Sequence, residues 1–355
     1  MSQPSPLNDY TGIIHLHSGY SFDGRTPLPE ILAQADRGGL DFLILTDHST
    51  LRAREDGFEG WQGRTLLIVG EEIAPRFNHY LAFRMPHPVS AGGFPPTPQH
   101  VIDEVRNQGG IGFIAHPDHE GTEMFHVKPY PWTDWSVTGY TGLGIWDFMT
   151  DWQNSLTNYP RALLSYAFPA LLLKGPSPDT LARWDILAQE RRIVGIGELD
   201  NHNTRVRFLG LDFPVFPFGR VFDLVRTHLL TPAPLSGDSG ADIAALLSAL
   251  ENGHAYVALD HDRPAAGFSL AVTEGGRTAT MGDDFTLERR AVLTVRLPHR
   301  ARIRIIRNGA CWLQAEQTEF AVPIDAPGVY RIEALLRVLG RWRPWIFSNP
   351  IYIRR

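Results

Sequence analysis

The sequence is poor in cysteine, in excess positive charge and in long apolar runs, and each shortage excludes a class of protein. Cys311 is the single cysteine among 355 residues, so one chain can form neither an internal disulfide framework nor a thiolate zinc cluster. The net charge of −6 lacks the basic excess that a nucleic-acid surface needs. No apolar run approaches the roughly 18 residues of a spanning helix, and the N-terminus lacks signal-peptide features. We therefore expect a cytoplasmic protein with no nucleic-acid or membrane partner.

Apolar and aromatic residues are abundant enough for packed cores throughout the chain. Hydrophobic residues make up 43% of the sequence, including 19 Phe, 10 Tyr and 9 Trp. A chain of 355 residues exceeds the usual size of a single core, which favours a barrel-sized domain followed by a smaller one. We predict an α/β domain over residues 1–265 and an all-β, sandwich-like (Ig-like) domain over residues 266–355, where short alternating runs are separated by Pro, Gly and Asn turns.

Apolar strand candidates alternate with helix candidates in the first 260 residues, and polar residues follow the strands where they end. Residues 41–46 and 65–70 are nearly continuous apolar runs, as in parallel strands covered on both faces. A helix is expected over residues 218–229. The aromatic-rich stretch at about 119–160 is interpreted as an insertion around one strand at 142–148. Its aromatic side chains either line a substrate pocket or belong to the core.

The first metal-site candidate is the pair His15 and His17, which ends the first apolar run. Side chains alternate between the faces of a strand, so the two imidazoles would point the same way while Leu16 points opposite. Later strand ends add further histidines and carboxylates, and the carboxyl ends of strands in an α/β barrel meet at one mouth. Imidazole with carboxylate suits zinc, manganese or iron. The candidate ligands are His15, His17, Asp23, His48, Glu72, His79, His116, Asp200 and His202.

All the candidate ligands except His79 stand in five short motifs, which are His15-x-His17 with Asp23, Thr46-Asp47-His48, Gly70-Glu71-Glu72-Ile73, Ala115-His116-Pro117 and Asp200-x-His202. In this order, over about residues 12–260, they resemble the motifs of the polymerase and histidinol phosphatase (PHP) superfamily. The resemblance implies a distorted seven-stranded (β/α) TIM-like barrel that hydrolyses phosphoester bonds with two to three divalent metal ions.

The resemblance also distributes the ligands among the ions. It implies that His15, His17, Glu72 and Asp200 hold one ion, that Glu72 bridges to a second ion held by His79 and His116, and that Asp23, His48 and His202 hold a third. Asp23 stands where some members have histidine, which favours manganese or iron over zinc. The interval from Glu72 to His79 is short for the family, and Glu71 is the rival for the bridging role.

Further residues are predicted to support the reaction. Glu72, Asp200 and His202 are the predicted catalytic residues, and Asp47 is expected to orient a ligand histidine. Phosphate-binding candidates are Arg25, Arg76 and Arg205, with Arg207 as a further possibility. His119 and His126 are candidates for protonating a leaving group.

The predicted function is that of a metal-dependent phosphoesterase whose metal-activated hydroxide attacks a small phosphorylated substrate. Two alternatives stay open. The same site could hydrolyse a carbamate or amide ester, since the aromatic stretch could hold an aryl group. The barrel could instead be a degenerate scaffold with a binding function.

Overall fold

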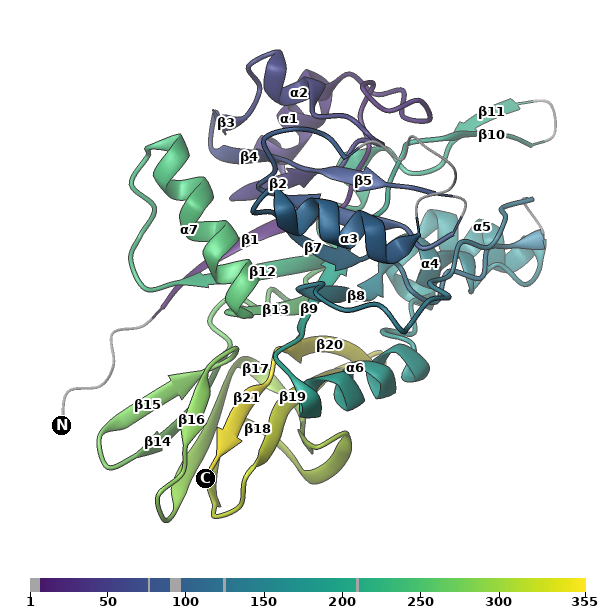
Figure 1. The fold of residues 1–355 in the computed structure, drawn as a ribbon. Helices are drawn as coiled ribbons and strands as arrows, with labels where there is room; N and C mark the ends of the chain where they lie inside the picture. The colour runs from purple at the N-terminus through teal and green to yellow at the C-terminus, as the bar shows by residue number, and fades with distance from the viewer. Residues whose placement is uncertain (1–6, 76, 90–96, 124–125, 209–210) are drawn as a thin grey trace.

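A mixed α/β part and an all-β part make up the computed structural model of the chain (Figure 1), which describes residues 7–75, 77–89, 97–123, 126–208 and 211–355. The α/β part comes first along the chain, and from Ser269 onward the described elements are strands. None of the helices in the described ranges combines the length and the apolar character that a membrane crossing needs.

The elements of the α/β part are, in chain order, β1 (Asn8–Ile14), α1 (Leu28–Arg37), β2 (Phe42–Leu45), α2 (Arg52–Glu55), β3 (Gly60–Gln62), β4 (Thr65–Val69), β5 (Glu71–Ile73), β6 (Tyr80–Phe83), α3 (Pro98–Asn107), β7 (Ile111–Ile114), β8 (Gly142–Asp147), α4 (Phe148–Gln153), α5 (Tyr159–Ala167), η2 (Pro169–Leu172), α6 (Pro178–Glu190), β9 (Val194–Glu198), β10 (Arg205–Phe208), β11 (Leu211–Pro214), η3 (Phe218–Arg220), β12 (Val225–Thr231), α7 (Ser239–Asn252) and β13 (Ala255–Leu259). The all-β part contains β14 (Ser269–Glu274), β15 (Arg277–Thr280), β16 (Asp284–Thr286), β17 (Ala291–Arg307), β18 (Ala310–Ile324), β19 (Gly328–Val338), β20 (Arg341–Ser348) and β21 (Ile351–Arg354).

Apart from the separate antiparallel pair β10/β11, the described strands of the α/β part belong to two sheets. One contains β13, β12, β1, β2, β4 and β3, with β1, β2 and β4 parallel; the other runs in the order β5-β6-β7-β8-β9. Backbone hydrogen bonds join the sheets on both sides, from Asp200 N–H to His15 C=O (2.8 Å) and from Glu72 N–H to Thr46 C=O (3.2 Å). The alternation of strands and helices was correctly predicted to give a mixed α/β fold, with antiparallel pairs at β5/β6, β6/β7, β1/β12 and β12/β13.

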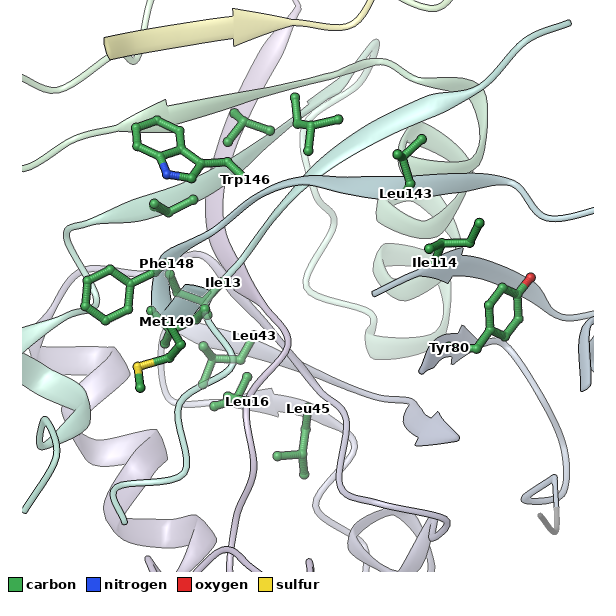
Figure 2. Packing of buried hydrophobic residues seen from close by; sticks show 14 of the residues in the cluster. Ile13, Leu16, Leu43, Leu45, Tyr80, Ile114, Leu143, Trp146, Phe148 and Met149 are labelled. Atoms are coloured by element: carbon green, nitrogen blue, oxygen red, sulfur yellow. The ribbon is translucent and has the colours of Figure 1, made fainter. Parts of the chain in front are cut away.

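The parallel strands form where the sequence has continuous apolar runs. Every residue of β2 and of β4 is buried, as expected for strands covered on both faces. Figure 2 shows Leu16, Leu43 and Leu45 close together, with Ile13 and Met149 beside them. This core lies beneath the strand ends that carry the candidate ligands, so it fixes where those ends point.

Residues 218–229 do not form the predicted helix. The segment has only the short turn η3 before β12, which lies between β1 and β13. In β12 every residue except Arg226 is buried, so the period-two alternation that would mark a strand is missing. Pairing with β1 and β13 therefore determines that this segment is a strand, and its local hydrophobic pattern does not.

The all-β part is continuous with the α/β part through one sheet. β20 pairs antiparallel with β13, and the strands after Ser269 enclose a second cluster of buried side chains that includes Trp345, Tyr330 and Ile303. The strands after Ser269 belong to the same hydrogen-bonded network as β13, β12, β1, β2, β4 and β3. The boundary predicted at residues 265 and 266 falls in the connection between β13 and β14 and stays a prediction.

Side chains from the all-β part also cover the open edge of β9. The Asn349 amide accepts a hydrogen bond from Gly195 N–H (2.8 Å) and donates to Gly195 C=O (2.9 Å) and Ala255 C=O (3.0 Å). The Tyr352 hydroxyl accepts from Ile193 N–H (3.0 Å). Nearby, the Arg331 guanidinium binds both carboxylate oxygens of Asp185 on α6 at 2.7 Å. The two parts therefore share buried polar contacts as well as a sheet.

We expect Asn349→Ala to destabilise the protein, because it leaves the buried N–H and C=O groups of Gly195 without the side-chain partner. The Ala255 carbonyl keeps the backbone N–H of residue 349. The expected loss in free energy of unfolding is about 3 kcal/mol, from roughly 1–3 kcal/mol for each unsatisfied group with partial relaxation. Urea denaturation measures it. Asn252→Ala is the matched control, because that amide bonds at an exposed helix end, and it should cost less than about 1 kcal/mol. Equal losses in the two variants would contradict this role of Asn349.

Candidate metal centre

The candidate ligands lie where strands of both sheets end. His15 and His17 follow β1, His48 follows β2, His116 follows β7, and Asp200 follows β9. Three of these residues have positive φ angles, with 72° at His15, 26° at His116 and 49° at Asp200. Residues other than glycine rarely adopt positive φ angles, and backbone strain of this kind is concentrated at functional sites. The backbone therefore turns sharply at the points where these side chains enter the site.

All nine predicted ligands come together in three overlapping groups. Within each group the potential ligand atoms lie within 4.8 Å of one another. Glu72 belongs to two groups and His17 to two. The groups are His15, His17, Glu72 and Asp200; Glu72, His79 and His116; and His17, Asp23, His48 and His202.

Glu72 is buried at the centre, and each of its carboxylate oxygens faces a different group. Its Oε2 lies 2.9 Å from His15 Nε2 and 3.1 Å from His17 Nε2. Its Oε1 lies 2.7 Å from His79 Nδ1 and 3.3 Å from His116 Nε2. Because one carboxylate presents separate oxygens to two sets of imidazoles, it can bridge two metal ions.

Asp23 and His17 mark the third group. Asp23 Oδ2 lies 3.1 Å from His48 Nε2 and 3.3 Å from His202 Nε2. The His17 ring stacks on the His202 ring with centroids 3.9 Å apart. The resemblance assigned His17 and Asp23 to different ions, and His17 belongs both to the group of His15 and to the group of Asp23.

The hairpin of β5 and β6 explains why His79 reaches the site despite its short interval from Glu72. Glu72 pairs with Leu81 in this antiparallel hairpin, so the chain returns to the same end of the sheet within seven residues. Glu71 points elsewhere, because neighbours on a strand face opposite sides. Its Oε1 accepts a hydrogen bond from Val89 N–H (2.6 Å), and burial raises the pKa of its carboxyl to about 7.

The buried imidazoles and carboxylates fit divalent metal ions. His17 is fully buried, and neither ring nitrogen has a hydrogen-bond partner, although Nε2 lies close to Glu72. Burial and the neighbouring His202 lower the pKa of His17, which favours the neutral imidazole that binds metals. Burial acts to raise the pKa of Glu72, but His15 and His79 hold it well below its usual range. His17 and Glu72 are therefore available in the unprotonated forms that ions need. At His116 burial lowers the pKa but Glu72 and Asp200 raise it to about 9, so an ion bound there would displace a proton.

Glu198 is a residue of the site that the sequence analysis did not select. Its Oε2 lies 2.8 Å from His15 Nδ1, and its Oε1 accepts a hydrogen bond from His116 N–H (2.9 Å). A Cβ atom at Gly144 would lie 1.3 Å from Glu198 Oε1, so glycine is required there. A carboxylate on the outer nitrogen of a ligand imidazole fixes the ring and its tautomer. The sequence feature that could have identified Glu198 is its position as the last residue of a buried strand.

The sequence suggested that Asp47 orients a ligand histidine, and this role stays a prediction. Its Oδ1 accepts a hydrogen bond from Ser18 N–H (2.6 Å), and its Oδ2 accepts one from the Ser18 hydroxyl (2.7 Å). Asp47 therefore fixes the turn that follows His17 and places the imidazole through the backbone.

A cavity of about 1420 Å³ opens beside the three groups. The exposed side chains of Arg25 and Arg205 line it, while Arg76 and the side chain of Arg207 lie outside the described residues. His119 also lines the cavity, and burial together with the charge of His116 lowers its pKa to about 4. His119 is therefore neutral at pH 7, and His126 is exposed and is not among the lining residues.

Comparison with known proteins gives structural matches only. No family model and no curated protein matches the sequence. A two-domain protein from Bacteroides vulgatus, described as containing a predicted PHP-like metal-dependent phosphoesterase, matches over 98% of this chain and 97% of its own, with 14% identity and a TM-score of 0.46. A proposed metal-dependent phosphoesterase from Bifidobacterium adolescentis matches 57% of this chain and 92% of its own, with 16% identity and a TM-score of 0.34.

We expect Glu72→Gln to lose most of the metal that the wild-type protein takes up, because its two oxygens face two groups. Elemental analysis after manganese loading measures the stoichiometry. Manganese should also raise the Tm of the wild-type protein by on the order of 5 °C, and this shift should vanish in the variant. Glu71→Gln is the matched control, since that adjacent buried carboxyl faces away, and it should retain the metal. Equal metal loss in both variants would contradict the assignment.

Proposed function

We propose that this protein is a metal-dependent phosphoesterase of the PHP type. The observation that carries the proposal is the Glu72 carboxylate, which presents one oxygen to His15 and His17 and the other to His79 and His116 beside an open cavity. Pairs of close ions are suited to phosphoryl chemistry because they stabilise both the attacking and the leaving oxygens. The proposal includes the finer fold, a distorted seven-stranded barrel formed by the two joined sheets.

The nine candidate ligands would be distributed among three ions. His15, His17, Glu72 and Asp200 would hold one ion, Glu72, His79 and His116 a second, and Asp23, His48 and His202 a third. Manganese, iron or zinc bound here would supply Lewis acidity and lower the pKa of water. Glu198 would keep His15 in the required tautomer and orientation, through the contact at its Nδ1.

The substrate phosphate would bind where the cavity is cationic. Arg25 and Arg205 line the cavity together with Asp23 and His202. Guanidinium groups bind phosphate oxygens through charge-assisted and often bidentate hydrogen bonds. His119 would remain neutral at pH 7, so we do not assign proton donation to its imidazolium.

One observation favours a second candidate, hydrolysis of a carbamate or amide ester. The cavity wall beyond the ligand groups includes Trp152, Tyr166 and Phe213, which could hold an aryl group. The same ions would activate water against a carbonyl carbon. A degenerate scaffold is disfavoured, because all nine predicted ligands lie in the three groups.

We expect the manganese-loaded protein to hydrolyse an aryl phosphate, and His17→Ala, Glu72→Ala and Asp200→Ala to lower kcat/KM at least about 100-fold. Glu198→Ala should lower it by about 10- to 100-fold, the usual effect of losing a residue that orients a ligand. Release of the aryl alcohol, followed by absorbance, measures the rate.

An aryl carbamate assayed in parallel decides between the two bonds. Faster turnover of the carbamate would favour the second candidate. Failure to hydrolyse either compound, with less than one bound ion per chain after manganese loading, would favour the scaffold.

A further inference from the structure

The cavity beside the ligand groups is larger than a small phosphorylated metabolite requires. Ligand pockets usually have volumes of about 300–1000 Å³, whereas this one has about 1420 Å³. Its lining divides into two regions. The polar region contains the ligand groups with Arg25 and Arg205, and the other region is formed mainly by α4, α5 and the end of β11.

The second region is an apolar wall built by one face of each helix. On and after α4, Met149, Trp152 and Leu156 line the cavity, at spacings of three and four residues. On α5, Ala162, Leu163 and Tyr166 do the same. Residues three and four apart share one side of a helix, so each helix presents an apolar stripe to the cavity. We call these six residues the apolar wall.

The apolar wall runs from the protein core to the surface. Met149 is 8% exposed and packs with Phe148 and the core residues around Ile13 (Figure 2). Leu163, at the other end, is 71% exposed. Five residues further along the chain, Phe168 is also apolar and 61% exposed. A large exposed apolar surface next to a pocket marks a binding region.

Resting on the proposed function, we propose that the substrate is a phosphate monoester of a long-chain alkyl alcohol. Its phosphate lies in the polar region, and its hydrocarbon chain lies along the apolar wall from Met149 toward Leu163. In the reaction water adds to phosphorus, the ester P–O bond breaks, and the long-chain alcohol leaves with a proton while inorganic phosphate remains. An extended chain covers a wall that runs from core to surface, whereas a single aryl ring covers only part of it.

The test is a series of ethyl, butyl, octyl and dodecyl phosphates, assayed below their micelle concentrations with the manganese-loaded protein. Burying one CH₂ group is worth about fourfold in binding. We expect kcat/KM to rise by about two- to fourfold for each added CH₂ until the wall is covered. The matching alkylphosphonates, which cannot be hydrolysed, should show the same trend in Kd by calorimetry.

A matched pair of variants locates the effect. Leu163→Asp should lower the ratio of dodecyl to ethyl phosphate turnover by about tenfold or more, since it places a charge on the apolar wall. Ile186→Asp is the control: Ile186 is also on a helix, α6, and is 60% exposed, but it is not among the cavity-lining residues. It should leave the ratio unchanged.

The outcomes separate this inference from the proposed function. Hydrolysis of all the phosphates at rates independent of chain length would overturn the proposal of a long-chain substrate, while the proposed phosphoesterase activity would be supported. Chain-dependent phosphonate binding without hydrolysis of any phosphate would support the apolar wall as a binding region and overturn the phosphoesterase. An equal drop in the turnover ratio for Leu163→Asp and Ile186→Asp would also overturn the role of the wall.

Discussion

The buried carboxylate of Glu72 is the constraint on which the arrangement of the site depends. A carboxylate with 1% exposure is costly unless positive charge or hydrogen-bond donors surround it. Imidazoles approach it from two sides, and they can be brought there only because the ends of β1, β5 and β7 and the start of β6 meet at one place. Positive φ angles at His15 and His116 help to surround the Glu72 carboxylate with imidazoles, because they turn these side chains inward at the strand ends. Divalent ions would offset the negative charge that Glu72, Asp200 and Asp23 concentrate in this volume.

The ligand set could be predicted from sequence because each member follows an apolar strand, and parallel strand ends meet at one mouth. The residues that hold the ligands in place could not. Glu198 reaches His15 across 183 positions of sequence, and only the juxtaposition of β9 and β1 brings them together. Asp47 was selected from the sequence as a supporting residue, but its hydrogen-bond partner Ser18 lies 29 positions away. Partners of this kind depend on tertiary packing, which leaves no periodic pattern in either segment.

The fold shows the same division between local pattern and long-range context. The helix α1 and the strands β2 and β4 could be predicted from the sequence, because the amphipathic pattern of α1 and the continuous apolar runs of β2 and β4 follow directly from how each element is buried. β12 was not, because a strand buried on both faces resembles a buried helix segment. The aromatic stretch at 119–160 was ambiguous for a physical reason. Trp146 packs into the core while Trp152, six residues later, lines the cavity, so both interpretations hold for different residues of one segment.

The all-β part supports the site through the edge of β9. Successive N–H groups on that edge belong to every second residue, as strand geometry requires. Ile193 and Gly195 are paired by Tyr352 and Asn349 from the all-β part, and Gly197 by the Thr227 hydroxyl of β12. Leu199 and Asp200 then bond to the backbone of β1. An edge strand with unpaired groups invites slippage or other pairing, and β9 carries Glu198 and leads to Asp200. Removing the strands after Ser269 would therefore free the start of β9, three residues before the carboxylate that orients His15.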